Sequence, residues 1–216
     1  MVNVTSEPGE GRVISGEINL GMVGYGRIAT RFIRELVFVK GIRLKGVFGL
    51  ISDVDNLRHF KETHKIDFYS FNYDEFLDRV DAVYIATPHL THFEYAIKAL
   101  EKGKHVLCEK PMATTLEDCQ KMVEAAERNG KFLMIGQNQR LAKAHVKARK
   151  LIESGEIGKI LTFRTTFGHP GPESWTGQKN SWFFDKTKAA FGAMADLGVH
   201  KTDLIHFLTG DVITEV

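Results

Sequence analysis

Apolar segments alternate with helical patterns between residues 18 and 137, and this alternation limits the fold more than any other feature. Residues 82–86 are continuously apolar, as a strand covered on both faces must be. Apolar residues between positions 93 and 100 recur at helical spacing, and another strand is expected at 105–108. Because parallel strands need a crossover of a dozen or more residues, the alternation predicts a doubly wound parallel α/β sheet.

The element boundaries follow from the same patterns and from turn residues. We expect strands over residues 18–23, 44–51, 82–86, 105–108 and 132–135, and helices over 28–37, 93–100 and 115–128. After about residue 137 we expect a basic helix (141–153), an extended stretch (160–167), a loop rich in Gly, Pro and Trp (168–190), a helix (196–208) and the start of a strand (212–216). The chain therefore divides into a flexible tail (1–16), a parallel α/β domain (17–137) and a second domain (138–216).

The composition excludes several classes of protein. The 216 residues include 29 basic and 27 acidic side chains, and a net charge of +2 gives no reason to expect nucleic acid or a membrane surface as partner. The N-terminus has no apolar core, and no apolar run approaches the roughly 20 residues of a membrane span, so we expect a cytoplasmic protein. Cys108 and Cys119 are too few for a disulfide framework or a four-cysteine zinc site; they could pair, although a reducing compartment suits them better.

A glycine-rich segment lies between the first predicted strand and the first predicted helix. Gly24-Tyr25-Gly26-Arg27-Ile28-Ala29 matches the dinucleotide-binding fingerprint. The first glycine permits a tight turn, the second lets a pyrophosphate approach the backbone at the helix N-terminus, and the alanine lets helix and strand pack closely. A glycine-rich turn can also occur in other α/β proteins, but at this place it favours nucleotide binding, and residues 17–137 are then a Rossmann domain.

The acidic residue that should bind the ribose about 20 positions later is missing. Gly49 stands at the end of the second predicted strand, and the first acids after it are Asp53 and Asp55. No arginine pocket for a 2′-phosphate is evident either. The choice between NAD and NADP stays open.

Two strands are followed by X-Pro pairs, Thr87-Pro88 and Lys110-Pro111. Proline holds the preceding residue extended, here at the carboxyl edge of the sheet, where open α/β sheets bind ligands. A lone lysine is commonly a solvated surface residue. Its position relative to the fingerprint instead favours Lys110 as a positive charge beside a substrate hydroxyl or carbonyl.

A third group of polar residues lies in the last predicted helix. Asp196, His200 and Asp203 are spaced to share one helix face. A histidine flanked by carboxylates is a candidate general base. The alternative is that Asp196 is an N-cap and His200 an ordinary helical histidine.

Other candidate residues carry less weight. His89 and His92 lack the cluster of ligands that a metal site needs, so we predict no metal. Four aromatic residues of the long loop are expected to pack the domain junction or to line a substrate pocket: Trp175, Trp182, Phe183 and Phe184.

Together these segments resemble the Gfo/Idh/MocA family of oxidoreductases (glucose–fructose oxidoreductase, inositol dehydrogenase and MocA). The resemblance extends from about residue 18 to the end, and its most specific stretch runs from Ala86-Thr87-Pro88 to Glu109-Lys110-Pro111. Asp196-x-Gly198-x-His200-x-x-Asp203 is similar to the family's catalytic helix. The family's usual Arg-Phe-x-Pro is replaced by Arg140-Leu141-Ala142-Lys143.

The resemblance implies a role for each of these residues. Lys110 would polarise the reacting oxygen, His200 would be the general acid or base, and Asp196 would orient it or the substrate. Asn138 and Arg140 match the family's segment at the domain junction. The implied cofactor residues are Gly24, Tyr25, Gly26, Arg27, Ile28, Thr87, Pro88, His92, Glu109, Lys110 and Asn138.

The resemblance also implies an activity. We expect a hydride transfer between NAD or NADP and a secondary alcohol or ketone of a sugar or cyclitol. Family members continue into an open antiparallel sheet that covers the substrate and commonly mediates oligomerisation, so this chain is expected to be C-terminally truncated and to form a homo-oligomer only with the full sheet. Two alternatives stay open: a non-catalytic relative that binds or senses NAD(P), and an assembly protein with a vestigial fingerprint.

Overall fold

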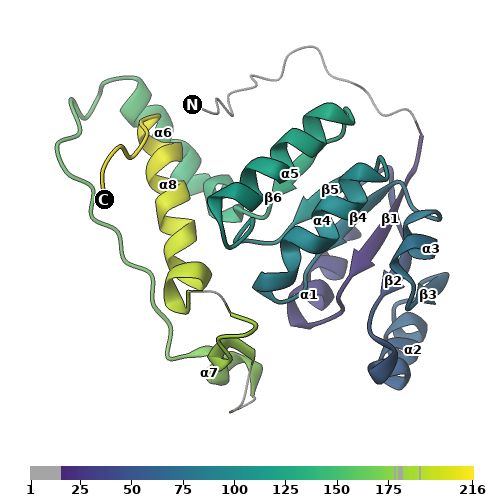
Figure 1. Ribbon diagram of the computed structural model, residues 1–216. Helices are drawn as coiled ribbons and strands as arrows, with labels where there is room; N and C mark the ends of the chain where they lie inside the picture. Colours follow the sequence, from purple (N-terminus) through teal and green to yellow (C-terminus); the bar gives the residue numbers. More distant parts are fainter. Residues whose placement is uncertain (1–15, 178, 180–181, 190) are drawn as a thin grey trace.

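A six-stranded parallel sheet forms the centre of the first domain in the computed structural model, which describes residues 16–177, 179, 182–189 and 191–216 (Figure 1). The predicted tail falls almost wholly outside these residues. The strand order is β3-β2-β1-β4-β5-β6, and every neighbouring pair is parallel. The strands are β1 (Ile18–Val23), β2 (Ile42–Phe48), β3 (Phe68–Ser70), β4 (Ala82–Ile85), β5 (His105–Cys108) and β6 (Leu133–Ile135). The predicted doubly wound sheet is confirmed, and its direction of winding reverses between β1 and β4.

Helices cover both faces of this sheet. On one face lie α1 (Arg27–Leu36) and α2 (Val54–Thr63), and on the other lie α3 (Tyr73–Leu77), α4 (His92–Glu101) and α5 (Leu116–Arg128). The second domain contains α6 (Lys143–Glu153), α7 (Pro172–Thr176) and α8 (Val199–Thr209). Short helical turns are η1 (Ile51–Asp53), η2 (His89–Thr91), η3 (Asn138–Leu141), η4 (Trp182–Phe184) and the π-helical turn η5 (Met194–Gly198).

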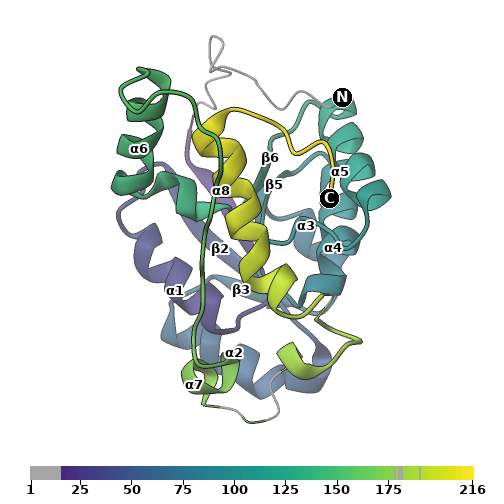
Figure 2. The same ribbon diagram turned by 90° about the vertical axis from the view of Figure 1, so that its left-hand side faces the viewer.

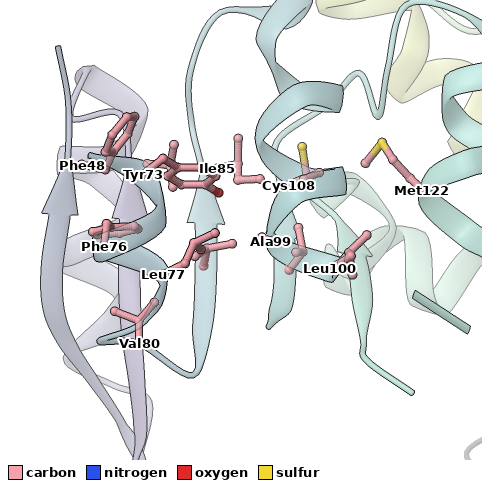
Figure 3. Close-up of a cluster of buried hydrophobic side chains, with 14 of the residues drawn as sticks. Phe48, Tyr73, Phe76, Leu77, Val80, Ile85, Ala99, Leu100, Cys108 and Met122 are labelled. Carbon is pink, nitrogen blue, oxygen red and sulfur yellow. The ribbon is translucent and has the colours of Figure 1, made fainter. Parts of the chain in front are cut away.

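The core of the first domain consists of two apolar layers, one on each side of the sheet. Figure 3 shows the larger layer, in which Phe76 of α3 and Leu100 of α4 pack against β-strand residues such as Ile85. Tyr84, the neighbour of Ile85 in β4, points to the opposite layer, where its ring stacks on Phe32 of α1 at 4.0 Å. Both sides of β4 are thus buried, which explains why its sequence is continuously apolar.

The second domain lies against the carboxyl edge of the sheet. Residues 154–171 run from α6 past the length of α8 to α7 (Figures 1 and 2). Arg140 and Lys201 link η3 to α8, since the Arg140 Nε donates to Asp203 Oδ2 at 3.0 Å and the Lys201 Nζ donates to the Gln139 side chain at 2.8 Å. In the described part of the chain, no strand follows β6, so the extended stretch at 160–167 pairs with no sheet there. The expected start of a strand at 212–216 is likewise not formed, because no partner strand lies beside it in the described residues.

Several local predictions need correction. β2 ends at Phe48 rather than at residue 51, because Ile51 already begins the turn η1. The elements β3, α2 and α3 were not predicted, and β3 and α3 have only three and five residues.

The two cysteines do not pair: Cys108 and Cys119 are free thiols. Among the described helices, none is long and apolar enough to cross a membrane.

Candidate active site

The fingerprint turn lies where β1, β2 and β4 end. Gly24 has a φ of +87°, in the left-handed region that favours glycine. A Cβ at this position would lie 3.0 Å from the Ala86 oxygen and 3.0 Å from the Thr87 Cγ2 atom, so no side chain fits. The Gly24 N–H donates to the Phe48 carbonyl oxygen at 3.1 Å and ties the turn to β2. The turn therefore lies at the switch point of the sheet, where such folds bind ligands.

The residues of this turn fit a dinucleotide. Gly26 is the N-cap of α1, and a Cβ there would meet no atom within 4 Å, so the backbone faces open space. Glycine has no side chain that could cap the first N–H groups of α1, and uncapped N–H groups at a helix N-terminus favour a phosphate. Arg27 and Ile28, which begin α1, are exposed. These residues would hold the pyrophosphate of the cofactor.

His92 joins the loop after β4 to the loop after β5. Its ring is fully buried, with Nδ1 2.7 Å from the Pro111 carbonyl oxygen and Nε2 2.9 Å from the Thr87 carbonyl oxygen. The desolvation that comes with burial lowers the pKa of His92. Both ring nitrogens face backbone carbonyl oxygens, so His92 supports the two loops, and its place beside the nicotinamide stays a prediction. Thr87 and Pro88 themselves are half-buried beside the fingerprint turn.

Glu109 lies on the face of the sheet that α1 covers. Its Oε1 accepts a hydrogen bond from the Tyr84 hydroxyl at 2.8 Å, and its Oε2 accepts one from the Lys110 backbone N–H at 3.3 Å. A Cβ at Gly136 would lie 3.1 Å from Glu109 Oε2, so the carboxylate occupies the space between the ends of β5 and β6. These contacts orient Glu109 toward the side on which the fingerprint helix lies.

Lys110 connects the two domains. Its Nζ donates to Asp196 Oδ1 at 2.5 Å and to the Asp196 carbonyl oxygen at 2.8 Å. The two side chains are only 14% and 15% exposed, so water and salt screen this ion pair much less than a surface pair. An ammonium has three N–H donors. One donor of Lys110 is therefore left for a substrate oxygen.

His200 lies one helical turn after Asp196 and is 8% exposed. Burial first, and then the positive charge of Lys110, lowers the pKa of His200 to about 4, although the carboxylates of Asp196 and Asp203 oppose this shift. Within the described structure the buried His200 Nδ1 has no hydrogen-bond partner. His200 is therefore neutral near pH 7 and can accept a proton.

Two further histidines lie beside the ion pair, and neither was predicted to belong to the site. The Nε2 atom of His169 is 3.7 Å from Asp196 Oδ2. His89 is 4% exposed, and burial, followed by the charges of His92 and Lys110, lowers its pKa to about 4. The only sequence signal for His169 is its position in the Gly- and Pro-rich loop that was expected near the substrate pocket. No three His, Cys, Asp or Glu side chains in the described ranges are placed to hold a metal ion.

The aromatic residues of the long loop reach the first domain. The Trp182 ring lies edge-on to His89 at 4.8 Å between centroids, and Phe183 stacks on Trp182 at 3.9 Å. These contacts place Trp182 and Phe183 at the domain junction, while Phe184 is 57% exposed. The side chain of Trp175 lies outside the described part of the structure. The long loop thus closes over the loop that follows β4.

Asn138 differs from the other predicted cofactor residues in its position. It begins η3 and is exposed. The side chains of its neighbours Gln139 and Arg140 bond to α8. The segment 138–140 therefore serves the domain junction, and a cofactor contact by Asn138 stays a prediction.

The two buried histidines should make the protein acid-sensitive. His89 and His200 have pKa values of about 4 when folded, against 6.5 for an unperturbed histidine. Between about pH 6.5 and about pH 4 the unfolded chain therefore binds more protons than the folded chain does, so the free energy of unfolding decreases as the pH falls across this window. We expect each histidine to remove about 1–3 kcal/mol of unfolding free energy between these limits.

This expectation is tested by urea unfolding of the wild type and of a His89→Gln/His200→Asn variant at a series of pH values. The variant should lose stability less steeply than the wild type below about pH 6.5. A His59→Asn variant, in which an exposed histidine is replaced, should follow the wild type. Parallel curves for the double variant and the wild type would show that the two histidines do not control acid stability.

Two family models match the sequence. Residues 18–137 match a model described as an oxidoreductase family with an NAD-binding Rossmann fold, under the name Gfo/Idh/MocA. Residues 145–216 match the model of a Gfo/Idh/MocA C-terminal domain. The predicted nicotinamide dinucleotide cofactor, NAD or NADP, is confirmed by the first match.

Individual relatives give the same picture. Glucose-6-phosphate 3-dehydrogenase of Bacillus subtilis is 33% identical over 198 residues, which are 91% of this chain and 55% of that protein. Levoglucosan dehydrogenase of Pseudarthrobacter phenanthrenivorans is 39% identical over 135 residues, which are 61% of this chain and 34% of that protein. A solved structure of levoglucosan dehydrogenase with NADH and levoglucosan aligns with a TM-score of 0.76 at 28% identity, over 90% of this chain and 55% of that one. The chain thus spans from about a third to just over half of the length of these relatives.

Proposed function

Because the chain belongs to the Gfo/Idh/MocA oxidoreductase family, we propose that it forms the cofactor-binding and catalytic part of an NAD(P)-dependent dehydrogenase. The proposed substrate is a secondary alcohol of a sugar or cyclitol, or the corresponding ketone. Its relatives include sugar and inositol dehydrogenases, which supports this class. The observation that carries the proposal is the ion pair between Lys110 and Asp196, because it joins the cofactor domain to the helix that bears His200.

The roles of the chain's residues follow from their environment. When bound, the nicotinamide supplies the redox half of the reaction, as hydride acceptor or donor. In the oxidative direction the neutral His200 takes the proton of the substrate hydroxyl, for which its lowered pKa leaves it ready at pH 7. The third N–H of Lys110 donates to the same oxygen and stabilises the negative charge that develops on it.

Asp196 acts on the substrate through Lys110. Its carboxylate and its carbonyl oxygen both accept from the lysine, so the ammonium is held in one orientation. The Nε2 atom of His169, in the long loop of the same domain, lies 3.7 Å from the other carboxylate oxygen of Asp196. The long loop that bears His169 and Trp182 then excludes water from the ion pair, which strengthens the field that Lys110 exerts on the substrate oxygen.

The proposal is tested on the protein translated from the complete reading frame, since this chain spans only part of its relatives. The purified protein is mixed with NAD or NADP and a panel of sugars, polyols and cyclitols, and formation of the reduced nicotinamide is followed by its absorbance. We expect continuous turnover with at least one secondary alcohol of the panel. Dinucleotide binding without turnover on any alcohol of the panel would favour the non-catalytic sensor, and no dinucleotide binding would favour an assembly protein.

A further inference from the structure

The second residue of the fingerprint has an unusual neighbour. The Tyr25 ring lies against Gly49, the first residue after β2, and a Cβ at Gly49 would be only 2.8 Å from the Tyr25 Cε1 atom. The ring also packs on Phe60 of α2 at 5.5 Å between centroids. The missing side chain at position 49 thus makes room for Tyr25, which bridges the fingerprint turn and the start of α2.

Tyr25 brings an acidic side chain to the turn. Its hydroxyl donates to Asp53 Oδ2, and the Asn56 side chain donates to the other carboxylate oxygen of Asp53. Asp53 is half-buried at the end of η1 and at the N-cap of α2. Its carboxylate is therefore held against the fingerprint turn, although the residue lies four positions beyond the one where an acid was expected.

The charges around this carboxylate favour a ribose with a free 2′-hydroxyl over a ribose that carries a 2′-phosphate. An ionised carboxylate can accept about four hydrogen bonds, so two remain on Asp53 for hydroxyl groups. Residues 49–57 contain Asp53 and Asp55 but no lysine or arginine. The next cation, Arg58, lies 3.5 Å from Asp55. A 2′-phosphate at this place would meet like charge, whereas ribose hydroxyls would find an acceptor.

We propose that Asp53, positioned by Tyr25, is the ribose-binding acid of this protein and makes its site selective for NAD(H) over NADP(H). The proposal rests on the proposed function only in requiring that the fingerprint turn holds a nicotinamide dinucleotide. Arg27, the cation within the fingerprint, lies at the start of α1 on the side expected to face the pyrophosphate. If the Arg27 guanidinium instead bound the 2′-phosphate, the site would prefer NADP(H).

The test measures binding of NADH and NADPH by calorimetry, so it does not depend on turnover. The wild type should bind NADH at least about tenfold more tightly than NADPH, the effect of one charge-assisted hydrogen bond. Asp53→Asn should reduce this ratio by about tenfold or more, mainly through weaker binding of NADH. Tyr25→Phe, which releases the carboxylate, should reduce the ratio by a smaller factor. Asp67→Asn is the matched control and should leave the ratio unchanged, because Asp67 is exposed, pairs with Arg43 and precedes β3, at the opposite edge of the sheet.

The outcomes separate the two proposals. Equal affinity of the wild type for both dinucleotides, or a preference for NADPH, would overturn the role of Asp53 while leaving dinucleotide binding intact. An unchanged ratio in Asp53→Asn would overturn it as well. If the wild type bound neither dinucleotide, the proposed function itself would fail, and the role of Asp53 with it. The wild-type comparison needs no variant, so a folding defect in Asp53→Asn cannot obscure it.

Discussion

Lys110→Met is expected to lower kcat by about 100- to 1,000-fold, the usual effect of removing one donor that stabilises a developing oxyanion. Methionine keeps much of the length of the side chain but removes the ammonium that pairs with Asp196 at 2.5 Å. Dinucleotide affinity should change less than about threefold, because the fingerprint turn and α1 bind the phosphates without Lys110. Steady-state kinetics and calorimetry with the same preparation measure both quantities.

Lys121→Met is the matched control, because Lys121 is an exposed lysine of α5 that pairs only with the neighbouring Glu117 in the described contacts. Its turnover should equal that of the wild type. Since Lys110→Met leaves the Asp196 carboxylate without its ammonium partner, Lys110→Met/Asp196→Asn should recover folding stability but not turnover. If the turnover of Lys110→Met were close to that of the wild type, Lys110 would take no part in the reaction.

His200→Asn is expected to lower kcat by about 100- to 10,000-fold at neutral pH, the range for loss of a general base. The wild-type rate should fall with acid only as the pH approaches about 4, because burial and the charge of Lys110 lower the pKa of His200 to about 4. An unperturbed histidine would place this limb near neutrality, and the buried position of His200 is the reason for the difference. In the variant the acid limb should be absent from the residual rate.

The profile of kcat/KM from neutral pH down to about pH 4 tests this second prediction. His59→Asn, which alters an exposed histidine of α2, should leave the profile as it is in the wild type. An acid limb that persists unchanged in His200→Asn would assign the base to another group. His89 and His169 would then be the residues to replace, since both lie near the carboxylate of Asp196.

Much of the first domain could be predicted from local patterns. β4 is buried on both faces, and its sequence is continuously apolar. The apolar run of β1 is interrupted only by Asn19 and Gly21, and β5 is apolar after its first residue, so all three strands are visible in the sequence. The helix that Thr115 caps was also predictable, since its hydroxyl accepts from the Asp118 N–H as the capping box requires. β3 was not predictable, because three residues are too few to show a period and their pairing with β2 is decided by tertiary contacts.

The candidate site was predictable only in part, for a physical reason. The fingerprint is local, so its turn and helix could be located from spacing alone. Lys110 and Asp196 are 86 residues apart, and only the family resemblance linked them before the structure did. Contacts such as those of His169 with Asp196, and of Tyr25 with Asp53, depend on how loops fold back and leave no period in the sequence. Burial, which decides the pKa of His200, is likewise a property of the packed domains.

We propose that the fingerprint turn, Lys110 and His200 surround one nicotinamide ring, and a crystal structure of the protein with NADH would test this arrangement. The pyrophosphate is expected at Gly26 and the nicotinamide beside the Lys110 ammonium and the His200 ring, with room for a substrate oxygen between those two groups. A nicotinamide bound on another face of the sheet, out of reach of both side chains, would contradict it.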